Sequence, residues 1–174
     1  NIPSGTEISA AMVQIQSPGQ GLQPNRLNDL IGRKLNMDGG AAFDELFSDI
    51  VQTIEACTTS SHPDLPPLGD RLQDSLDAMR EAVDWLKDAD MKDRLAGATP
   101  FLTLAGETVG GWLLCIGAVA ARRRQKENIG DPAFAAQRIA LANFYAEAVM
   151  TLAPSRVDDV TMGADMIDEV GFGN

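Results

Sequence analysis

Apolar residues recur at helical spacing along most of the chain after residue 26. A short helix is predicted over residues 27–35, and Asp38-Gly39-Gly40 ends it. The next helix has apolar residues at i, i+3, i+4 and i+7, and these are Phe43, Leu46, Phe47, Ile50, Val51 and Ile54. A loop rich in serine and proline follows over residues 58–67. Beyond it, a second stripe predicts a helix from Leu68 to about Lys92.

Two further helices are predicted from their start signals. Thr99-Pro100 and Asp131-Pro132 each combine an N-cap residue with a proline at the first helical position. The helix that follows Asp131 carries apolar residues as far as Leu152, and Pro154 is expected to stop it. A short terminal helix is predicted over residues 157–170. Residues 8–15 are the one segment in which a strand and a helix are equally compatible with the pattern.

These elements predict an all-α fold, an antiparallel (up-and-down) bundle of four main helices. Residues 1–26 are rich in proline and glycine and are expected to form a loop-rich N-terminal segment. Residues 27–174 are expected to form the helical bundle domain.

One stretch resembles a membrane span. From residue 99 to 121 the only charged residue is Glu107, and Arg122-Arg123-Arg124 follows directly. The charge-free part, residues 108–121, is shorter than the roughly 20 residues that a spanning helix needs. A buried bundle helix is therefore predicted, and its glycines Gly106, Gly110, Gly111 and Gly117 are expected to let a neighbouring helix approach closely.

Composition excludes two classes of partner. The 174 residues contain 14 Lys+Arg and 25 Asp+Glu, for a net charge of −11. Such a chain repels phosphate backbones and anionic lipid surfaces, so neither a nucleic acid nor a membrane is expected as a partner. Cys57 and Cys115 are expected to be buried reduced thiols, which fits a cytoplasmic protein. The segment 1–5 has no basic or apolar run of a secretory signal, and without an initiator Met the chain is expected to be processed or part of something longer.

Few residues have the spacing of a catalytic or metal site. The single histidine, His62, lies in a proline-rich loop, so no metal site of the usual kind is expected. Glu107 has two interpretations: an ion pair with an arginine of a neighbouring helix, or a pocket carboxylate with raised proton affinity. The cations of 122–126 either complement the helix dipole or anchor a nucleotide phosphate. Trp85 and Trp112 are expected to pack in the core.

Three stretches occur in the same order as in a known family. They are Leu27-Asn28-Asp29-Leu30-Ile31-Gly32-Arg33-Lys34-Leu35 with Asp38-Gly39-Gly40-Ala41-Ala42, Thr99-Pro100-Phe101-Leu102 with Gly110-Gly111-Trp112-Leu113-Leu114, and Phe144-Tyr145-Ala146-Glu147 with Gly163-Ala164-Asp165. Over roughly residues 13–170 the chain resembles the C-terminal region of the acyl-CoA dehydrogenase family. The resemblance is closest to the larger bacterial members with an extra C-terminal helical domain, among them the 3-methylmercaptopropionyl-CoA dehydrogenases.

The resemblance implies a parent flavoenzyme that is a homo-oligomer. Such an enzyme uses FAD to oxidise an acyl-CoA to the 2,3-enoyl-CoA, while a glutamate removes the α-proton. The N-terminal helices and the β-domain that build most of the FAD and acyl-CoA pockets in that family are absent from these 174 residues. No cofactor is therefore expected for this chain alone.

The family's glutamate base has no counterpart in this sequence. One alignment of residues 14–23 places Ser17 at the base position, and an alignment without a gap places Gln20 there. Neither side chain abstracts an α-proton near neutral pH, and Glu7 falls in neither register. No catalytic residue is assigned.

Three functions follow as hypotheses. The first is a C-terminal helical domain of an FAD-dependent acyl-CoA dehydrogenase-like protein, not catalytic by itself, that caps the catalytic core and contributes to oligomer contacts. Its partners would be the remainder of the enzyme, or a catalytic subunit, and a second copy. The alternative is a free-standing, non-catalytic helical subunit that binds a protein partner, and the loss of the glutamate favours it. A third, small-molecule binding by the bundle, rests on Glu107 and the arginine cluster. A domain from a larger enzyme is expected to expose a sizeable apolar patch.

Overall fold

The computed structural model describes residues 41–164, and all of the described secondary structure is helical. The predictions for residues 8–15 and 27–35, and the proposed boundary at residues 26 and 27, lie outside the described residues. The predicted terminal helix over residues 157–170 is wrong at its end, because the helix stops at Thr161, and its part beyond Ala164 lies outside the described residues.

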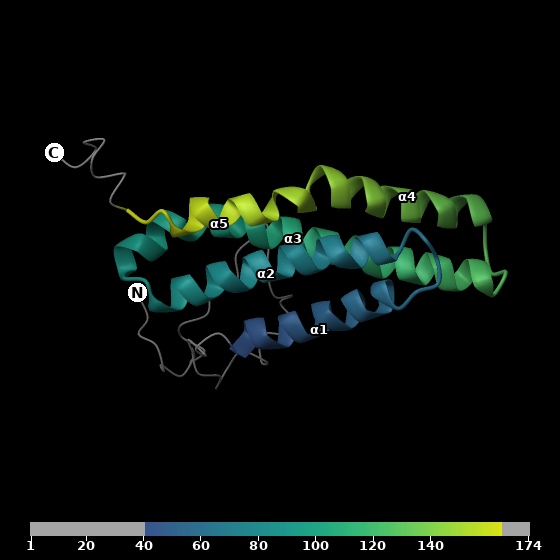
Figure 1. Cartoon of the computed structure of the whole chain (residues 1–174), viewed down its shortest axis with the longest axis horizontal. Helices are drawn as coiled ribbons and strands as arrows, with labels where there is room; N and C mark the ends of the chain where they lie inside the picture. The colour runs from purple at the N-terminus through teal and green to yellow at the C-terminus, as the bar shows by residue number, and fades with distance from the viewer. Residues whose placement is uncertain (1–40, 165–174) are drawn as a thin grey trace, which may run out of the picture. The chain divides into compact units, whose positions relative to one another are not determined.

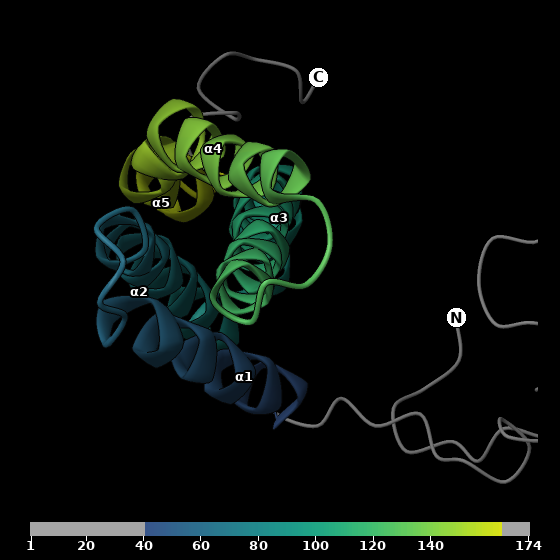
Figure 2. The same ribbon diagram turned by 90° about the vertical axis from the view of Figure 1, so that its right-hand side faces the viewer.

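Five α-helices and one 3₁₀ turn form the bundle. They are α1 (Ala41–Thr58), α2 (Pro66–Asp88), α3 (Met91–Lys126), α4 (Pro132–Ala148), η3 (Met150–Leu152) and α5 (Ala153–Thr161). Figures 1 and 2 show α1, α2 and α3 running side by side in alternating directions, with α4 and α5 together in the fourth position. The predicted all-α antiparallel bundle is confirmed.

The predicted boundary between the second and third helices is wrong. We expected one helix to about Lys92 and a new start at Thr99-Pro100. Instead α2 ends at Asp88 and α3 begins at Met91, because Asp90 caps it by accepting the backbone N–H groups of Lys92 and Asp93 at 2.8 and 3.0 Å. Pro100 lies inside α3. A proline there removes one backbone hydrogen bond, a cost that the packing of the long helix offsets.

Pro154 does not end the last helix, contrary to the prediction. α4 already stops at Ala148, the chain makes the single turn η3, and Pro154 lies in the first turn of α5. A proline fits there because the first-turn N–H groups have no partner within the helix. The hydroxyl of Ser75 donates to the Met150 carbonyl at 3.3 Å, so a core side chain binds one of the carbonyls at the break.

Other predicted elements are confirmed with small shifts. α1 covers the predicted apolar stripe, and the loop is confined to residues 59–65 because both prolines at 66–67 belong to α2. Asp131 caps α4 as predicted, since its carboxylate accepts the N–H of Ala133 at 2.9 Å. Between α3 and α4, Asn128 takes a left-handed backbone conformation (φ 55°), and the N–H of Ile129 returns to the Arg124 carbonyl at 2.9 Å.

The core is aliphatic, in a chain in which aromatic residues make up only 5%. Its fully buried large side chains include Ile50, Leu65, Leu68, Leu72, Leu76, Met79, Leu104, Met150 and Val160. Trp85 and Trp112 pack against this core, as expected, and the indole N–H of Trp112 donates to the Thr53 hydroxyl at 2.8 Å.

Cys57 and Cys115 are both buried free thiols, which confirms the prediction for the two cysteines. The contact with Cys57, together with burial, raises the pKa of the Cys115 thiol. The Cys115 thiol is therefore held in the neutral form, in which burial costs least.

Glycines permit close contacts where α3 meets the last helices. A Cβ on Gly110 would lie 2.8 Å from the Tyr145 hydroxyl, and one on Gly111 would overlap the Met150 side chain. The predicted close approach is therefore confirmed at these positions, whereas a Cβ on Gly106 would meet nothing within 4 Å.

Gly97 gives the sharpest test of this packing. A Cβ there would lie 2.6 Å from the carbonyl oxygen of Val160 in α5, and a backbone atom cannot rotate away. We expect Gly97→Ala to lower the free energy of unfolding in urea by about 1–3 kcal/mol. The same change at Gly106 is the matched control, and at low protein concentration it should be neutral or stabilising by up to about 1 kcal/mol. Equal effects at both positions would contradict the α3–α5 packing.

Candidate functional site

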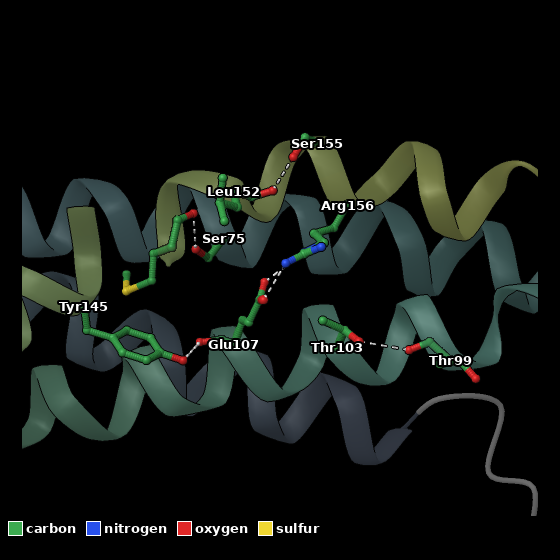
Figure 3. A network of polar contacts seen from close by, with 9 residues as sticks. Ser75, Thr99, Thr103, Glu107, Tyr145, Leu152, Ser155 and Arg156 are labelled. Carbon is green, nitrogen blue, oxygen red and sulfur yellow. Dashed lines mark hydrogen bonds and ion pairs between the residues drawn. The ribbon is translucent and has the colours of Figure 1, made fainter. Parts of the chain in front are cut away.

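A partly buried ion pair joins α3 to α5. Arg156 donates from Nε to Glu107 Oε2 at 3.1 Å and from Nη2 to Glu107 Oε1 at 2.7 Å, as Figure 3 shows. The two side chains are 18% (Glu107) and 30% (Arg156) exposed. Hydrogen bonding and attraction to Glu107 raise the pKa of the Arg156 guanidinium. The expectation that Glu107 pairs with an arginine of a neighbouring helix is confirmed.

Tyr145 joins α4 to the same residue of α3. Its hydroxyl donates to the backbone carbonyl of Glu107 at 3.2 Å, across the space that Gly110 leaves open (Figure 3). Burial, and then the charge of Glu107, raise the pKa of the Tyr145 phenol. Glu107 therefore binds α4 through its backbone and α5 through its side chain.

The chemistry available at this cluster is limited. Both carboxylate oxygens of Glu107 accept from one guanidinium, so the group is oriented for helix packing rather than for proton transfer. A shallow pocket of 410 Å³ lies beside it, lined by Arg156, Pro100, Thr103 and other residues, but Glu107 is not among the lining residues. The arrangement supports a structural role for the pair.

The basic residues at the end of α3 are only partly brought together. Arg123 and Arg124 lie in the last turn of the helix, where the prediction places them, and Arg123 pairs with Glu127 at 3.1 Å. Arg122 and Arg124 instead line an open pocket of 460 Å³ to which the α1–α2 loop contributes His62. That approach of His62 was not visible in the sequence, because it depends on the packing of α1 against α3. Phosphate binding by these arginines stays a prediction.

Two further predictions concern metal ligands and the base position of the family. Within residues 41–164, no three His, Cys, Asp or Glu side chains are grouped so that they could hold a metal ion. Ser17 and Gln20, the two alternatives for the base position, lie outside the described residues, as does Glu7.

The outward side of α3 is the feature that the sequence interpretation missed. Among the described residues one helix, α3, is long and apolar enough to cross a membrane by length and composition alone. Only 33% of its apolar window is buried in the bundle, so the prediction of a buried helix is correct for one side only. The exposed apolar side chains follow one another at helical spacings of four, seven, eleven and three residues: Met91, Leu95, Leu102, Leu113 and Ile116. This second helical spacing, distinct from that of the buried residues, was the sequence signal for an exposed apolar side of α3.

Tyr145 is the only tyrosine in the chain, so its ionisation can be followed directly. We expect the near-ultraviolet absorbance of the phenolate to rise with a midpoint above the ordinary pKa of about 10 in the folded protein. In denaturant the midpoint should return to that value. Because the folded state holds this proton more tightly, its contribution to stability is complete below the unfolded pKa and is lost as pH rises through the folded one. Equal midpoints in the two states would contradict the described environment.

Replacing the carboxylate tests the ion pair. Glu107→Gln keeps the size of the side chain but leaves Arg156 without its charged acceptor, so we expect Tm to fall by about 3 °C in a thermal scan at fixed concentration. Glu81→Gln, at an exposed position of α2, is the control and should leave Tm nearly unchanged. A Glu107 variant as stable as the control would show that the pair contributes nothing.

Most of the bundle is similar to known proteins. The family described as acetyl-CoA dehydrogenase C-terminal like matches residues 46–170. The 3-methylmercaptopropionyl-CoA dehydrogenase of Ruegeria pomeroyi (strain ATCC 700808 / DSM 15171 / DSS-3) is 27% identical over 151 residues, which cover 85% of this chain and 25% of that protein. The chain thus spans about a quarter of the length of this relative. The resemblance noted in the sequence is confirmed: the chain belongs to the acetyl-CoA dehydrogenase C-terminal-like family.

Proposed function

We propose that this chain acts as the C-terminal helical domain of an FAD-dependent acyl-CoA dehydrogenase-like protein and is not catalytic by itself. It caps the catalytic part and contributes to oligomer contacts, and the parent reaction is the α,β-dehydrogenation of an acyl-CoA thioester. The observation that carries the proposal is the family match over residues 46–170, together with an aligned region that covers 25% of the relative.

The surface of the bundle supports a role in contacts. Exposed apolar side chains gather on α3 and α4, where Phe144, for example, is 69% exposed. An isolated soluble domain rarely exposes a large apolar patch, whereas a domain that packs against further protein does. The bonds of Glu107 to Arg156 and Tyr145 serve this role by keeping α4 and α5 in place on α3.

Two helix N-termini in the described part of the chain are unsuited to the pyrophosphate of FAD. A dinucleotide pyrophosphate commonly binds at an open helix N-terminus, where backbone N–H groups point at it. The N-termini of α3 and α4 are instead occupied by the carboxylates of Asp90 and Asp131, which accept those N–H groups and repel an anion. We therefore propose that the flavin is held by a catalytic part outside this chain. A cytoplasmic location is part of the same proposal, supported by the two buried free thiols.

The proposal is tested on the endogenous protein, purified gently from its source. We expect a native mass several times 18.6 kDa together with the visible absorption of a bound flavin. Peptide mapping then shows whether these 174 residues are covalently part of the larger polypeptide or belong to a separate subunit. A colourless monomer or dimer of this chain alone would contradict the proposal and favour the free-standing helical subunit.

The isolated chain provides a second measurement. We expect neither FAD nor an acyl-CoA to bind it, so neither should raise its Tm at saturating concentration. A ligand that binds only the folded state would raise the Tm. A clear rise with FAD would overturn the placement of the flavin outside this chain.

A further inference from the structure

One side of α3 carries no charge over most of the helix. Its buried residues, such as Leu104, Thr108 and Cys115, face the other helices. The opposite side is turned away from them (Figure 2) and exposes a continuous apolar stripe. We call this the α3 stripe, and it consists of Met91, Leu95, Ala98, Leu102, Gly106, Val109, Leu113, Ile116 and Ala120. Leu102 and Leu113 are 70% and 56% exposed.

Gly106 lies within the α3 stripe and differs from the glycines around it. Gly110, Gly111 and Gly117 make room for side chains of α4 and η3, and each therefore has a function inside the bundle. A Cβ on Gly106 would meet nothing within 4 Å. A glycine in a helix interior lowers helix stability by up to about 1 kcal/mol relative to alanine. At Gly106 no contact within the described bundle offsets this cost, whereas a helix approaching from outside would.

The position of Gly106 makes the α3 stripe suitable for contact with its own copy. The stripe runs for about 45 Å along the helix, and Gly106 lies close to its middle. Two such helices that cross antiparallel at Gly106 would place Leu102 of one copy against the segment from Val109 to Leu113 of the other. A two-fold contact requires this kind of self-complementary surface.

Charge favours the same choice of surface. The chain has a net charge of −11, so most contacts between two copies bring like charges together. The outward side of α2 shows this clearly, with exposed acidic residues at Asp70, Asp74, Asp77, Glu81, Asp84 and Asp88. The α3 stripe avoids that repulsion because it contains no ionisable side chain.

The neighbouring helix enlarges the apolar area. A stable contact buries about 800 Å² on each partner, more than one helix face alone supplies. α4 packs beside α3 and exposes Phe134, Leu141 and Phe144. The exposed side chains of α4 therefore add apolar surface to that of the α3 stripe.

We propose that two copies of this chain associate through the α3 stripe, with the two α3 helices crossing at Gly106. The inference rests on the proposed role of the bundle in oligomer contacts, and it identifies the surface and the occupant of one such contact.

Sedimentation equilibrium of the 174-residue chain tests the association. We expect a mass twice the 18.6 kDa of one chain at micromolar concentration, in reversible equilibrium with the monomer. Gly106→Gln should raise the dissociation constant by about tenfold or more, because the added side chain occupies the crossing point. It should not unfold the monomer, since glutamine favours a helix more than glycine does and has open space here.

Ala136→Gln is the matched control. Ala136 is exposed on α4 two residues after Phe134, and therefore on the opposite side of that helix. The control variant should dimerise like the unmodified chain, and circular dichroism should show both variants fully helical.

Cross-linking tests the crossing point itself. Gly106→Cys should give a covalent dimer under mild oxidation with oxidised glutathione. Each new disulfide takes two electrons from two thiols and releases two protons, and the oxidant is reduced. The bond requires Cα atoms within about 7 Å, which only a crossing near Gly106 provides. Cys57 and Cys115 are buried and should not contribute, and Ala136→Cys should remain monomeric on a non-reducing gel.

Three results would overturn the inference. The first is a monomer at all concentrations up to about 100 µM, well above the micromolar range of ordinary specific association. The second is a dimer that Gly106→Gln leaves unchanged, and the third is a monomer that floats with phosphatidylcholine vesicles. The last result would assign the α3 stripe to a bilayer, which the length and composition of α3 also permit. None of them affects the flavin and mass measurements on the endogenous protein, so the two proposals fail separately.

Discussion

The centre of the bundle depends on Ser75, a fully buried polar residue of α2. Its backbone carbonyl accepts the hydroxyl of Thr108 from α3 at 3.5 Å, and its own hydroxyl donates to the carbonyl of Met150 at 3.3 Å. The Met150 carbonyl also accepts the backbone N–H of Ala153, so the Ser75 hydroxyl adds a second hydrogen bond that ties α2 to the break between α4 and α5. The position of this break in turn sets where α5, and with it Arg156, meets α3.

Local rules predicted the elements in which one signal stood alone. The apolar periodicity predicted α1, and the capping chemistry of Asp131 predicted the start of α4. Thr99-Pro100 failed because Asp90 offers a competing cap nine residues earlier, and the apolar pattern runs through both sites. Pro154 failed for a related reason, since a proline in a first turn and a proline after a last turn look the same in sequence.

The sequence predicted one half of the candidate site, the paired state of Glu107, but not which residue pairs with it. The isolated charge of Glu107 in an apolar helix indicated a basic partner, but the partner's identity depends on a contact between residues 49 positions apart. The exposed side of α3 was missed because an apolar helix was assigned to the core as a whole. Composition gives the amount of apolar surface, whereas only packing shows that α1, α2 and α4 leave one side of α3 uncovered.

The break at η3 has a consequence for how this family can vary. Tyr145 and Arg156 both bind Glu107, one through its backbone and one through its side chain, although they belong to different helices. The number of residues between Tyr145 and Arg156 is therefore constrained, because both must reach the same residue of α3. One residue inserted or deleted between Ala148 and Ala153 would rotate α5 by about 100° relative to α4 and leave Glu107 with only one of its partners. The connection can change its residues more readily than its length.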